Sequence, residues 1–457
     1  MYRLPILTTL LALMVTAANL QAQTQFTLYK LSNTVPEANL LNPALLPSHR
    51  VTISLPVLGS VYTSMNNDNL AINDLFTDYG NGGLNFIATE ADEDRILNAL
   101  RDVNDLDLDA QVNLFYIGYR ANNNYFSFSA TQKGHATLSY TKELINWAIK
   151  GPASDNFINS AFRTDDIFLE AQSYLEWGFG YTREVNNKFT IGGRIKLLQG
   201  QVSINTEELD ASIFSNADSA NITVNRMLIN TTGLIDGLSA NDVLFNTSNI
   251  GFGFDLGVVI TPIERLKISA AINNIGRISW SENTEAYSLN NVTYDFEGFD
   301  VLDLVNDNDT DDLLGSEADT IEARFDPVET LGVDYSTTTP INVYAGADFE
   351  FRKGQRAGAM LYAQVIKNKI KPALGLSYNL QIRRVFNLAA TASVIDGQFS
   401  NLGLGFSVKG GPIQFYAATD NALGALLPAR SSVFDLRLGL TLAFGKVADS
   451  NSRDDSR

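Results

Sequence analysis

The residue types that most often carry chemistry are sparse in this chain of 457 residues. It contains no cysteine and two histidines, His49 and His135. Cysteine nucleophiles, thiolate zinc sites and disulfide frameworks are therefore excluded. Neither histidine lies in a recognisable nucleophile motif, and no glycine-rich loop is placed to hold a phosphate. We therefore expect a protein that is not an enzyme and that uses no cofactor.

The residues with metal-ligand spacing lie in the most acidic part of the chain. Residues 281–330 hold 15 acidic side chains and one basic side chain. Three aspartates in this segment have the spacing that opens a calcium loop: Asp307, Asp309 and Asp311. Asp312 stands where such a loop needs glycine, and Ala318 stands where it needs a bidentate glutamate. We therefore expect a solvated acidic loop, which would hold calcium or magnesium only weakly.

The balance of charge excludes one class of partner. Asp and Glu number 51 and Lys and Arg number 33, so the formal net charge is -18. Such a chain offers no basic face that could displace counterions from phosphates, so we expect no nucleic-acid partner. A hydrophobic content of 45% is enough for a large core or a large barrel.

Residues 1–22 have the pattern of a secretory signal peptide. Arg3 precedes an apolar run from Leu4 to Ala18, and Ala22 marks the expected cleavage site. The run is too short for a transmembrane helix and lacks a stop-transfer flank. A secreted chain can still enter a membrane as a β-barrel, because barrel closure satisfies the backbone polar groups.

The elements that must position the polar residues are strands. In the closing stretch FDLRLGLTLAF, residues 434–444, the even positions are all apolar and the odd ones include Asp435 and Arg437. A period of two over this length is typical of a strand. Similar runs begin near Val51 and total about fourteen, many of them near the ~10 residues that cross a membrane at a tilt.

The connections between these runs alternate in length. If the closing strand ends in the periplasm, links of two to five residues fall on that side and the long links fall on the other, including 65–105, 205–248 and 281–340. Sandwiches and propellers give no reason for such sorting, whereas outer-membrane barrels have short periplasmic turns and long outer loops. We therefore predict a closed antiparallel transmembrane β-barrel over residues 50–444 in the bacterial outer membrane, followed by a polar tail, 445–457.

In such a barrel the apolar positions face lipid and the polar positions face the lumen. This assignment places eight charged residues in the lumen: Glu170, Glu176, Arg194, Lys196, Asp255, Asp348, Glu350 and Arg437. The last strand also resembles the C-terminal signal that the barrel-assembly machinery reads, at Arg437, Gly439, Leu442 and Phe444. The polar tail after Phe444 departs from that signal. We accordingly expect outer-membrane lipid and the assembly machinery as partners.

The segment between leader and barrel, residues 23–49, resembles the N-terminal hatch of a known family. Its Asn42, Pro43 and Ala44 look like the NPA motif in the hatch of the long-chain fatty-acid transporter family of outer-membrane barrels. Pro43 and Pro47 disfavour regular strand pairing and favour a compact, irregular plug. The resemblance implies that this segment closes the lumen.

The layout of the whole mature chain carries a second resemblance. With NNIGRISW at 273–280 and TDN at 419–421, it resembles an uncharacterised barrel family of Bacteroidota that is distantly similar to those transporters. This resemblance implies a channel or transporter for hydrophobic or amphipathic small molecules, since a simple water-filled porin would not need its lumen closed. The alternative is an envelope scaffold or an accessory of a secretion apparatus, whose acidic loops hold an envelope protein while nothing crosses.

Overall fold

The computed structural model describes residues 24–446, with gaps at 69, 72–73, 75, 79–83, 87–89, 151–158, 217–219, 235–246, 297–322, 368, 384, 396–397 and 428–429. Three predictions from the sequence lie outside the described residues: the signal peptide, the aspartates Asp307, Asp309 and Asp311, and the tail beyond residue 446.

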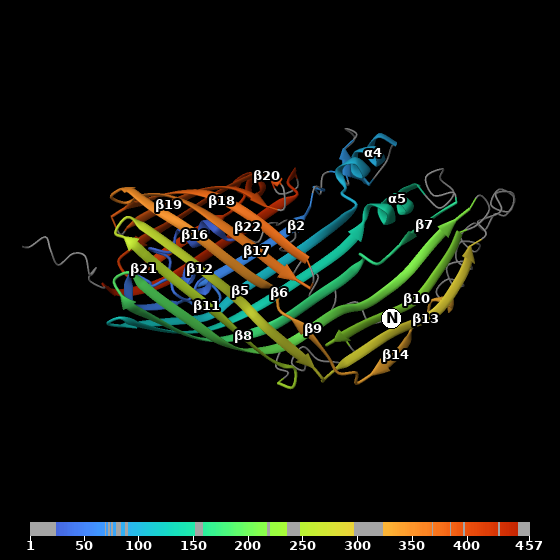
Figure 1. Ribbon diagram of the computed structural model, residues 1–457, viewed down its shortest axis with the longest axis horizontal. Helices are drawn as coiled ribbons and strands as arrows, with labels where there is room; N and C mark the ends of the chain where they lie inside the picture. The colour runs from blue at the N-terminus through green and yellow to red at the C-terminus, as the bar shows by residue number, and fades with distance from the viewer. Residues whose placement is uncertain are drawn as a thin grey trace, which may run out of the picture.

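The structure confirms the closed antiparallel barrel of 14 strands (Figure 1). Each wall strand pairs with its neighbours along the chain. The last strand, β22 (Val433–Lys446), pairs back onto the first, with Val51 opposite Phe444 and Val61 opposite Leu438. This pairing closes the wall, so both edges of the sheet find a partner.

Two short strands share the first position of the wall, β1 (His49–Ser54) and β2 (Ser60–Asn67), and both pair with β22 and β5. The wall continues in chain order through β5 (Val103–Ala121), β6 (Asn124–Thr141), β8 (Phe168–Asn186), β9 (Phe189–Ser215), β11 (Ile250–Ile263), β12 (Leu266–Trp280), β16 (Ile341–Arg352), β17 (Gln355–Ile366), β18 (Lys369–Ile382), β19 (Phe386–Ile395), β20 (Gln398–Gly410), β21 (Ile413–Thr419) and β22.

Residues 55–59 form a bulge that interrupts the first strand, and Val57 and Leu58 within it are 52% and 62% exposed. Leu440 still donates its backbone N–H to the Leu58 carbonyl at 2.9 Å, so the break remains attached to β22. Val57 has a φ of 64°, a left-handed conformation that β-branched residues rarely adopt. Gly59 is required at the end of the bulge, because a Cβ there would lie 2.4 Å from the Cβ of Ser54.

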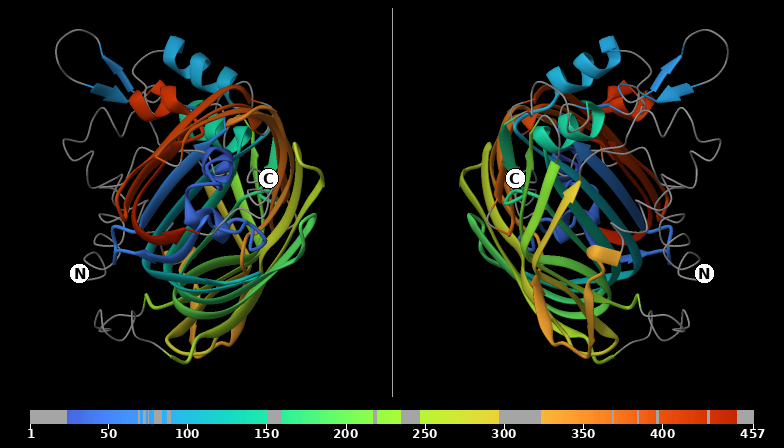
Figure 2. Two further views of the ribbon diagram at one scale, coloured as in Figure 1. Left: turned by 90° about the vertical axis from the view of Figure 1, so that its left-hand side faces the viewer. Right: turned by 90° about the vertical axis from the view of Figure 1, so that its right-hand side faces the viewer.

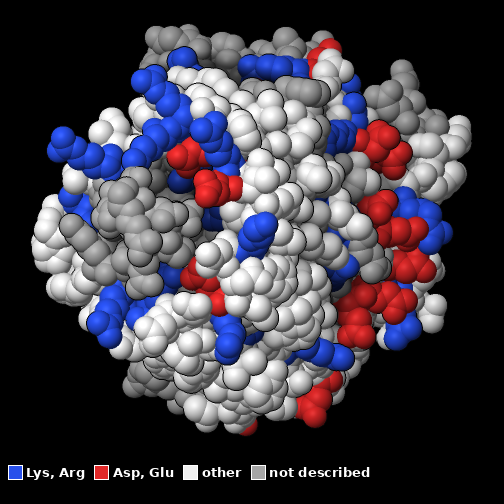
Figure 3. Space-filling model, turned by 60° about the vertical axis from the view of Figure 1, so that its left-hand side comes forward, with Lys and Arg blue, Asp and Glu red and all other residues white. Residues whose placement is uncertain are grey.

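The exterior of the wall is apolar, as a membrane barrel requires. In β18 the side chains of Ile370, Leu374 and Leu376 are 66%, 49% and 63% exposed, whereas the intervening Ala373 is buried. Figure 3 shows broad areas of the wall without Lys, Arg, Asp or Glu, and a group of acidic side chains at the right-hand edge of that view. The pattern is the inverse of a soluble sandwich, in which the apolar face would point inward.

One end of the barrel carries the long connections, and we call it the outer end. There β9 runs on past the wall and pairs with the strands of an outer sheet, which projects to the right in Figure 1. The elements of this end are β7 (Ser160–Arg163), β10 (Ala220–Thr232), β13 (Thr284–Phe296), β14 (Val328–Leu331), β15 (Tyr335–Thr338), the hairpin of β3 (Phe76–Asp78) and β4 (Leu84–Phe86), and the helices α4 (Glu90–Ala99), α5 (Lys142–Lys150) and α9 (Ala422–Leu426). Among the described residues, no helix is long and apolar enough to span a membrane.

The remaining elements are α2 (Phe26–Lys30) and the 3₁₀ helix η1 (Pro36–Leu40). Both belong to residues 24–48, which we call the hatch segment. Figure 2 shows this segment, in dark blue, enclosed by the barrel in both end views.

Candidate functional site

The hatch segment fills part of the barrel lumen and is itself almost fully buried. Residues 24–48 are buried except for five half-buried positions: Ser32, Asn33, Leu40, Leu46 and Ser48. Pro36 opens η1, where its missing N–H costs no hydrogen bond. A chain of such irregular elements is stable here because the surrounding wall, and not its own hydrogen bonding, supplies most of the contacts.

One side of the hatch segment packs on an apolar part of the wall, formed mainly by β16–β21. The Tyr29 ring stacks on Tyr344 with 5.5 Å between centroids, and Phe26 meets the edge of Tyr362 at 6.2 Å. These rings belong to a buried cluster to which the hatch segment contributes Phe26, Leu28, Tyr29, Leu31, Val35, Ala38, Leu41, Ala44 and Leu45. The members from the barrel, which we call the apolar wall, are Val259, Ala271, Tyr344, Met360, Tyr362, Ala373, Ala389, Tyr416 and Ala418.

Asn42 is the centre of the turn that follows η1. Its side-chain oxygen accepts the backbone N–H of Ala44 at 2.8 Å, and its amide nitrogen donates to the Tyr29 hydroxyl at 2.8 Å. The same nitrogen lies 3.3 Å from the carbonyl oxygen of Ala270 on β12. The predicted NPA position therefore joins α2, the turn and the wall.

Two glycines let the turn approach the wall. A Cβ on Gly192 would lie 2.2 Å from the Pro43 carbonyl oxygen, and a Cβ on Gly257 would lie 2.0 Å from Asn42 Oδ1. Thr182 donates its hydroxyl to the same Pro43 carbonyl. The turn is thus fitted against β8, β9 and β11 at once.

Asp420, the middle residue of TDN, holds the beginning of the hatch segment. Its carboxylate accepts the backbone N–H groups of Phe26 and Thr27, each at 2.8 Å, and the hydroxyl of Thr24. The backbone N–H of Asp420 in turn donates to the Asp435 carboxylate at 2.7 Å. A carboxylate at the first turn of a helix satisfies N–H groups that have no intrahelical partner.

Glu37 ties the hatch segment to the seam where the barrel closes. Its Oε1 accepts the hydroxyl of Ser54 on β1 at 2.6 Å and the hydroxyl of Thr441 on β22. Its Oε2 has no partner among the described residues, and the side chain is fully buried. Burial raises the pKa of the Glu37 carboxyl, so the neutral acid is favoured in the docked segment.

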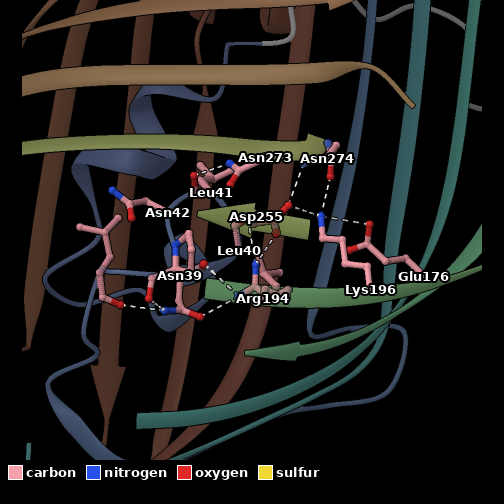
Figure 4. Close-up of polar contacts among 12 residues, drawn as sticks. Asn39, Leu40, Leu41, Asn42, Glu176, Arg194, Lys196, Asp255, Asn273 and Asn274 are labelled. Carbon is pink, nitrogen blue, oxygen red and sulfur yellow. Dashed lines mark hydrogen bonds and ion pairs between the residues drawn. The ribbon is translucent and has the colours of Figure 1, made fainter. Parts of the chain in front are cut away.

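The opposite side of the hatch segment meets an ionic network (Figure 4). Arg194 donates to the carbonyl and side-chain oxygens of Asn39 at 3.0 and 2.8 Å, and to Asp255 at 3.1 Å. Asp255 is shared with Lys196, whose Nζ lies 2.7 Å from Oδ1. Removing one partner of such a buried group leaves a charge without compensation, at a cost of about 3–5 kcal/mol.

The network extends away from the hatch segment through Lys196 and Lys133. Lys196 donates to Asn274 Oδ1 at 2.6 Å, and both lysines lie within 3.3 Å of the Glu176 carboxylate. Asn274 is placed by a bulge, because Asp255 on β11 faces both Asn273 and Asn274 on β12. Asn274 has a φ of 60°, which asparagine tolerates better than most residues. We call the residues of this network the polar wall: Lys133, Glu176, Arg194, Lys196, Asp255 and Asn274.

Further charges continue along the lumen toward the outer end. Lys371 bridges Asp105 and Asp107, and Lys369 donates to Asp105 at 2.7 Å. Lys367, beyond them, lies 3.6 Å from Glu170. Acidic and basic side chains thus alternate from the outer end to the hatch segment.

His135 lies in this part of the lumen with Asp109 and Thr137 on either side. The ring nitrogens are 3.0 Å from Asp109 Oδ1 and 3.1 Å from Thr137 Oγ1. Thr137 donates its own proton to Asp107 at 2.7 Å and not to the imidazole. In a hydrolase triad the hydroxyl group donates to the imidazole, so this trio is not arranged as such a triad.

Two small cavities adjoin the tip of the hatch segment and share five lining residues: Gln25, Gln111, Lys133, Asn274 and Asn342. Their volumes are ≈ 30 and ≈ 40 Å³. Each has room for a few water molecules. We call the two cavities together the polar chamber.

The structure brings together four of the eight residues predicted to face the lumen, Glu176, Arg194, Lys196 and Asp255. The other four are separate from that network. Asp348 pairs with Lys30 of the hatch segment at 2.7 Å, Glu350 pairs with Arg356 at 3.0 Å, Glu170 lies near Lys367, and Arg437 donates to Ser60 and Gln111.

Sequence reasoning missed Glu37 and Asn39, which hold the hatch segment, and Lys133 in the ionic network. Only the motif resemblances at 273–280 and 419–421 pointed to Asn273, Asn274 and Asp420. In the last strand, Gly439 gives room to the Tyr416 ring, which a Cβ would meet at 2.3 Å, and Phe444 is 43% exposed on the outside. Recognition of this strand by the assembly machinery stays a prediction.

A family model matches residues 43–420, most of the chain. Its description is a family of unknown function, DUF5723. The chain belongs to this family. No curated protein matches the sequence.

Among solved structures, this DUF5723 protein is similar to the toluene transporter TbuX of Ralstonia pickettii, with 9% identity and a TM-score of 0.41 over 93% of this chain and 95% of that one. It is also similar to a FadL homologue of Pseudomonas aeruginosa, with 12% identity and a TM-score of 0.42 over 93% and 97% of the two chains. Both TM-scores lie below 0.5, so we assign the fold from the strand pairing of this chain and not from these similarities.

Proposed function

We propose that this protein is an outer-membrane channel for a small amphipathic molecule and that the hatch segment is its closure. The observation that carries the proposal is the two-sided lining of the space that the hatch segment occupies. The apolar wall lies on one side of it and the polar wall on the other. A molecule that replaced the segment would meet both walls, which suits an amphipathic cargo better than a plain hydrocarbon.

Passage requires the hatch segment to move. The polar chamber has room for only a few waters in this state, so a small-molecule cargo does not fit in it while the segment is docked. The segment is held by many separate contacts, each worth about 0.5–1.5 kcal/mol net for a neutral hydrogen bond. A cargo that binds the displaced state better than the docked state shifts the population toward the open barrel.

Deleting residues 24–47 tests whether the segment closes the lumen. We expect the barrel to remain folded, because the wall strands pair without this segment, and we expect leak of small polar solutes from proteoliposomes to rise. Heat-modifiability on gels reports that the barrel has folded. A folded deletion variant that leaks no more than the full chain would contradict the proposal.

A reversible lock gives a sharper version of the same test. The hydroxyl oxygens of Thr34 in the hatch segment and Ser407 on β20 are 2.8 Å apart, and the chain has no cysteine of its own. The double variant Thr34→Cys, Ser407→Cys should form a disulfide that keeps the segment docked. We expect arabinose entry into liposomes to fall when the pair is oxidised and to recover on reduction. Each single variant, treated in the same way, is the control.

The scaffold alternative makes the opposite predictions. It expects no change in leak when the hatch segment is deleted, and loss of a specific envelope protein from the purified complex when residues 281–330 are removed. Both results together would contradict the channel proposal and support the scaffold.

A further inference from the structure

Several residues that line the polar chamber carry buried polar atoms that have no hydrogen-bond partner among the described residues. Four are acceptors, Gln25 Oε1, Asn113 Oδ1, Asp109 Oδ2 and Asn273 Oδ1, and two are donors, Asn113 Nδ2 and Arg437 Nε. Both amide atoms of Asn113 are unsatisfied although its side chain is 2% exposed. Buried polar groups in proteins are nearly always hydrogen-bonded, so these atoms are placed to bind water or a polar ligand.

The charges that line the chamber are compensated for the most part within the protein. Lys133 pairs with Glu176 at 2.7 Å, and Asp109 pairs with His135 at 3.0 Å. Asp109 lines one of the two cavities and Arg437 lines the other, so a head group that spans the chamber faces one acidic and one basic side chain. Neither an anionic head group nor an ammonium group can therefore enter without also meeting a like charge.

The balance of unsatisfied atoms indicates which neutral groups fit. Without Gln25, which the ligand would displace, three acceptors and two donors remain, so the ligand must both donate and accept hydrogen bonds, which a carboxylate or an ether cannot do. A hydroxyl group supplies one donor and two acceptor lone pairs and can serve both kinds of atom. Tyr62, Tyr174 and Tyr344 also line the chamber.

Gln25 at the tip of the hatch segment partly fills this chamber. It lines both cavities, is 8% exposed, and has a left-handed φ of 51° that is unusual for a residue other than glycine. Its amide carries a donor group and an acceptor group, as a hydroxyl-bearing ligand does. The side chain comes from the segment that must move for the lumen to open.

We propose that the polar chamber binds an uncharged, hydroxyl-rich head group of the cargo, and that Gln25 occupies this position while the hatch segment is docked. The inference rests on the proposed function, and it names the polar half of the amphipathic cargo. Ligand and Gln25 compete for one space, so binding of the head group favours release of the tip of the segment.

Three probes with one tail and different heads test the inference: hexyl β-D-glucoside, hexanoate and hexylammonium. Their binding to the full chain in lipid nanodiscs is measured by saturation-transfer NMR titration. We expect hexyl glucoside to bind most tightly. Gln25→Ala should raise its affinity about fivefold, because the competing side chain is gone. Asn113→Leu should lower it about tenfold, because the two unsatisfied amide atoms are lost.

Asn230→Leu is the matched control. Asn230 is a buried amide on β10 with an unsatisfied Oδ1, it donates to Glu207 and not to the hatch segment, and it lines neither cavity. This variant should leave glucoside affinity unchanged. Gln25→Ala alters no wall strand, so the test stands even if Asn113→Leu does not assemble. Tighter binding of either charged probe, or a glucoside affinity unaffected by Gln25→Ala, would overturn the inference.

A failure of the head-group inference can be distinguished from a failure of the proposed channel function. If arabinose entry depends on the Thr34–Ser407 disulfide but the glucoside shows no preference, the hatch segment still closes a channel and only the head-group assignment fails. If the disulfide has no effect on entry while the glucoside binds in a Gln25-dependent way, the chamber is a binding site in a protein that is not a channel.

Discussion

Asp420 accepts a hydrogen bond from the backbone N–H of Thr27 at 2.8 Å, although 393 positions separate the two residues in the chain. The contact joins the end of β21 to the first turn of α2, and it places the start of the hatch segment inside the barrel. The Asp420 carboxylate thus caps the N-terminus of α2, although it lies near the other end of the sequence. A substitution at Asp420 should therefore weaken the docking of the hatch segment.

Replacing Asp420 with alanine should loosen the hatch segment without unfolding the barrel. Three donors lose their charged acceptor, so docking should weaken by about 2 kcal/mol. Lys30, buried in the docked segment, should then become a site of tryptic cleavage that mass spectrometry detects. Asp420→Asn keeps one acceptor oxygen and should be intermediate, and Asp165→Ala, at an exposed position, is the control. An unchanged cleavage rate at Lys30 would argue against this anchor.

Adjacent glycines on β9 should differ sharply in their tolerance of a methyl group. Gly192→Ala would put a Cβ within 2.2 Å of the Pro43 carbonyl oxygen, whereas the nearest atom to a Cβ on Gly193 is 3.7 Å away. We therefore expect Gly192→Ala to push the Asn42 turn off the wall and raise solute leak. Gly193→Ala should behave like the parent protein in the same liposome assay. Equal leak from the two variants would show that the turn does not seal the lumen.

The docking of the hatch segment should weaken as pH rises. Burial raises the pKa of Glu37 above its ordinary value of 4.5, so the docked state binds the proton more tightly than the released state. The stabilisation is then complete below 4.5 and is lost as pH rises through the higher, docked pKa. Leak should accordingly increase over a titration from about pH 4 to about pH 9.

Glu37→Gln provides the control for this titration. The amide keeps an oxygen for Ser54 and Thr441 and cannot ionise, so the contribution of this position to the pH dependence should disappear. Arg437 is the nearest cation that favours the charged form of Glu37, and it stays in place in this variant. A titration curve that is the same for both proteins would assign the pH dependence to another group.

The outward face of β22 should reject charge. Leu438 is 39% exposed on the apolar exterior, and Leu438→Arg should cost ~2–4 kcal/mol if it lies near the midplane of the bilayer. Leu426→Arg is the matched control, because Leu426 is 76% exposed on α9 at the outer end. Urea unfolding in lipid vesicles should separate the two variants. A larger loss for Leu426→Arg would reverse the assignment of the faces.

Much of the fold follows from the sequence because its cause is local. Side chains alternate along a strand with a period of two, so the alternation of apolar and polar residues in FDLRLGLTLAF identifies both the element and its two faces. The sorting of short and long connections then predicts a barrel, and the pairing of β22 with β1 and β2 closes it. Pro43 and Pro47 likewise indicate by themselves that the hatch segment cannot join the sheet.

The partners of the polar residues were decided only by the tertiary structure. Arg194 binds Asn39 across 155 positions, and Glu37 reaches Thr441 across 404. No periodicity encodes such pairs, because which inward side chain meets the hatch segment depends on strand register, on the bulge at Asn274 and on the depth to which the segment enters the barrel. The strand pattern could therefore predict that Arg194 faces the lumen, while the enclosed space alone determined what it binds there.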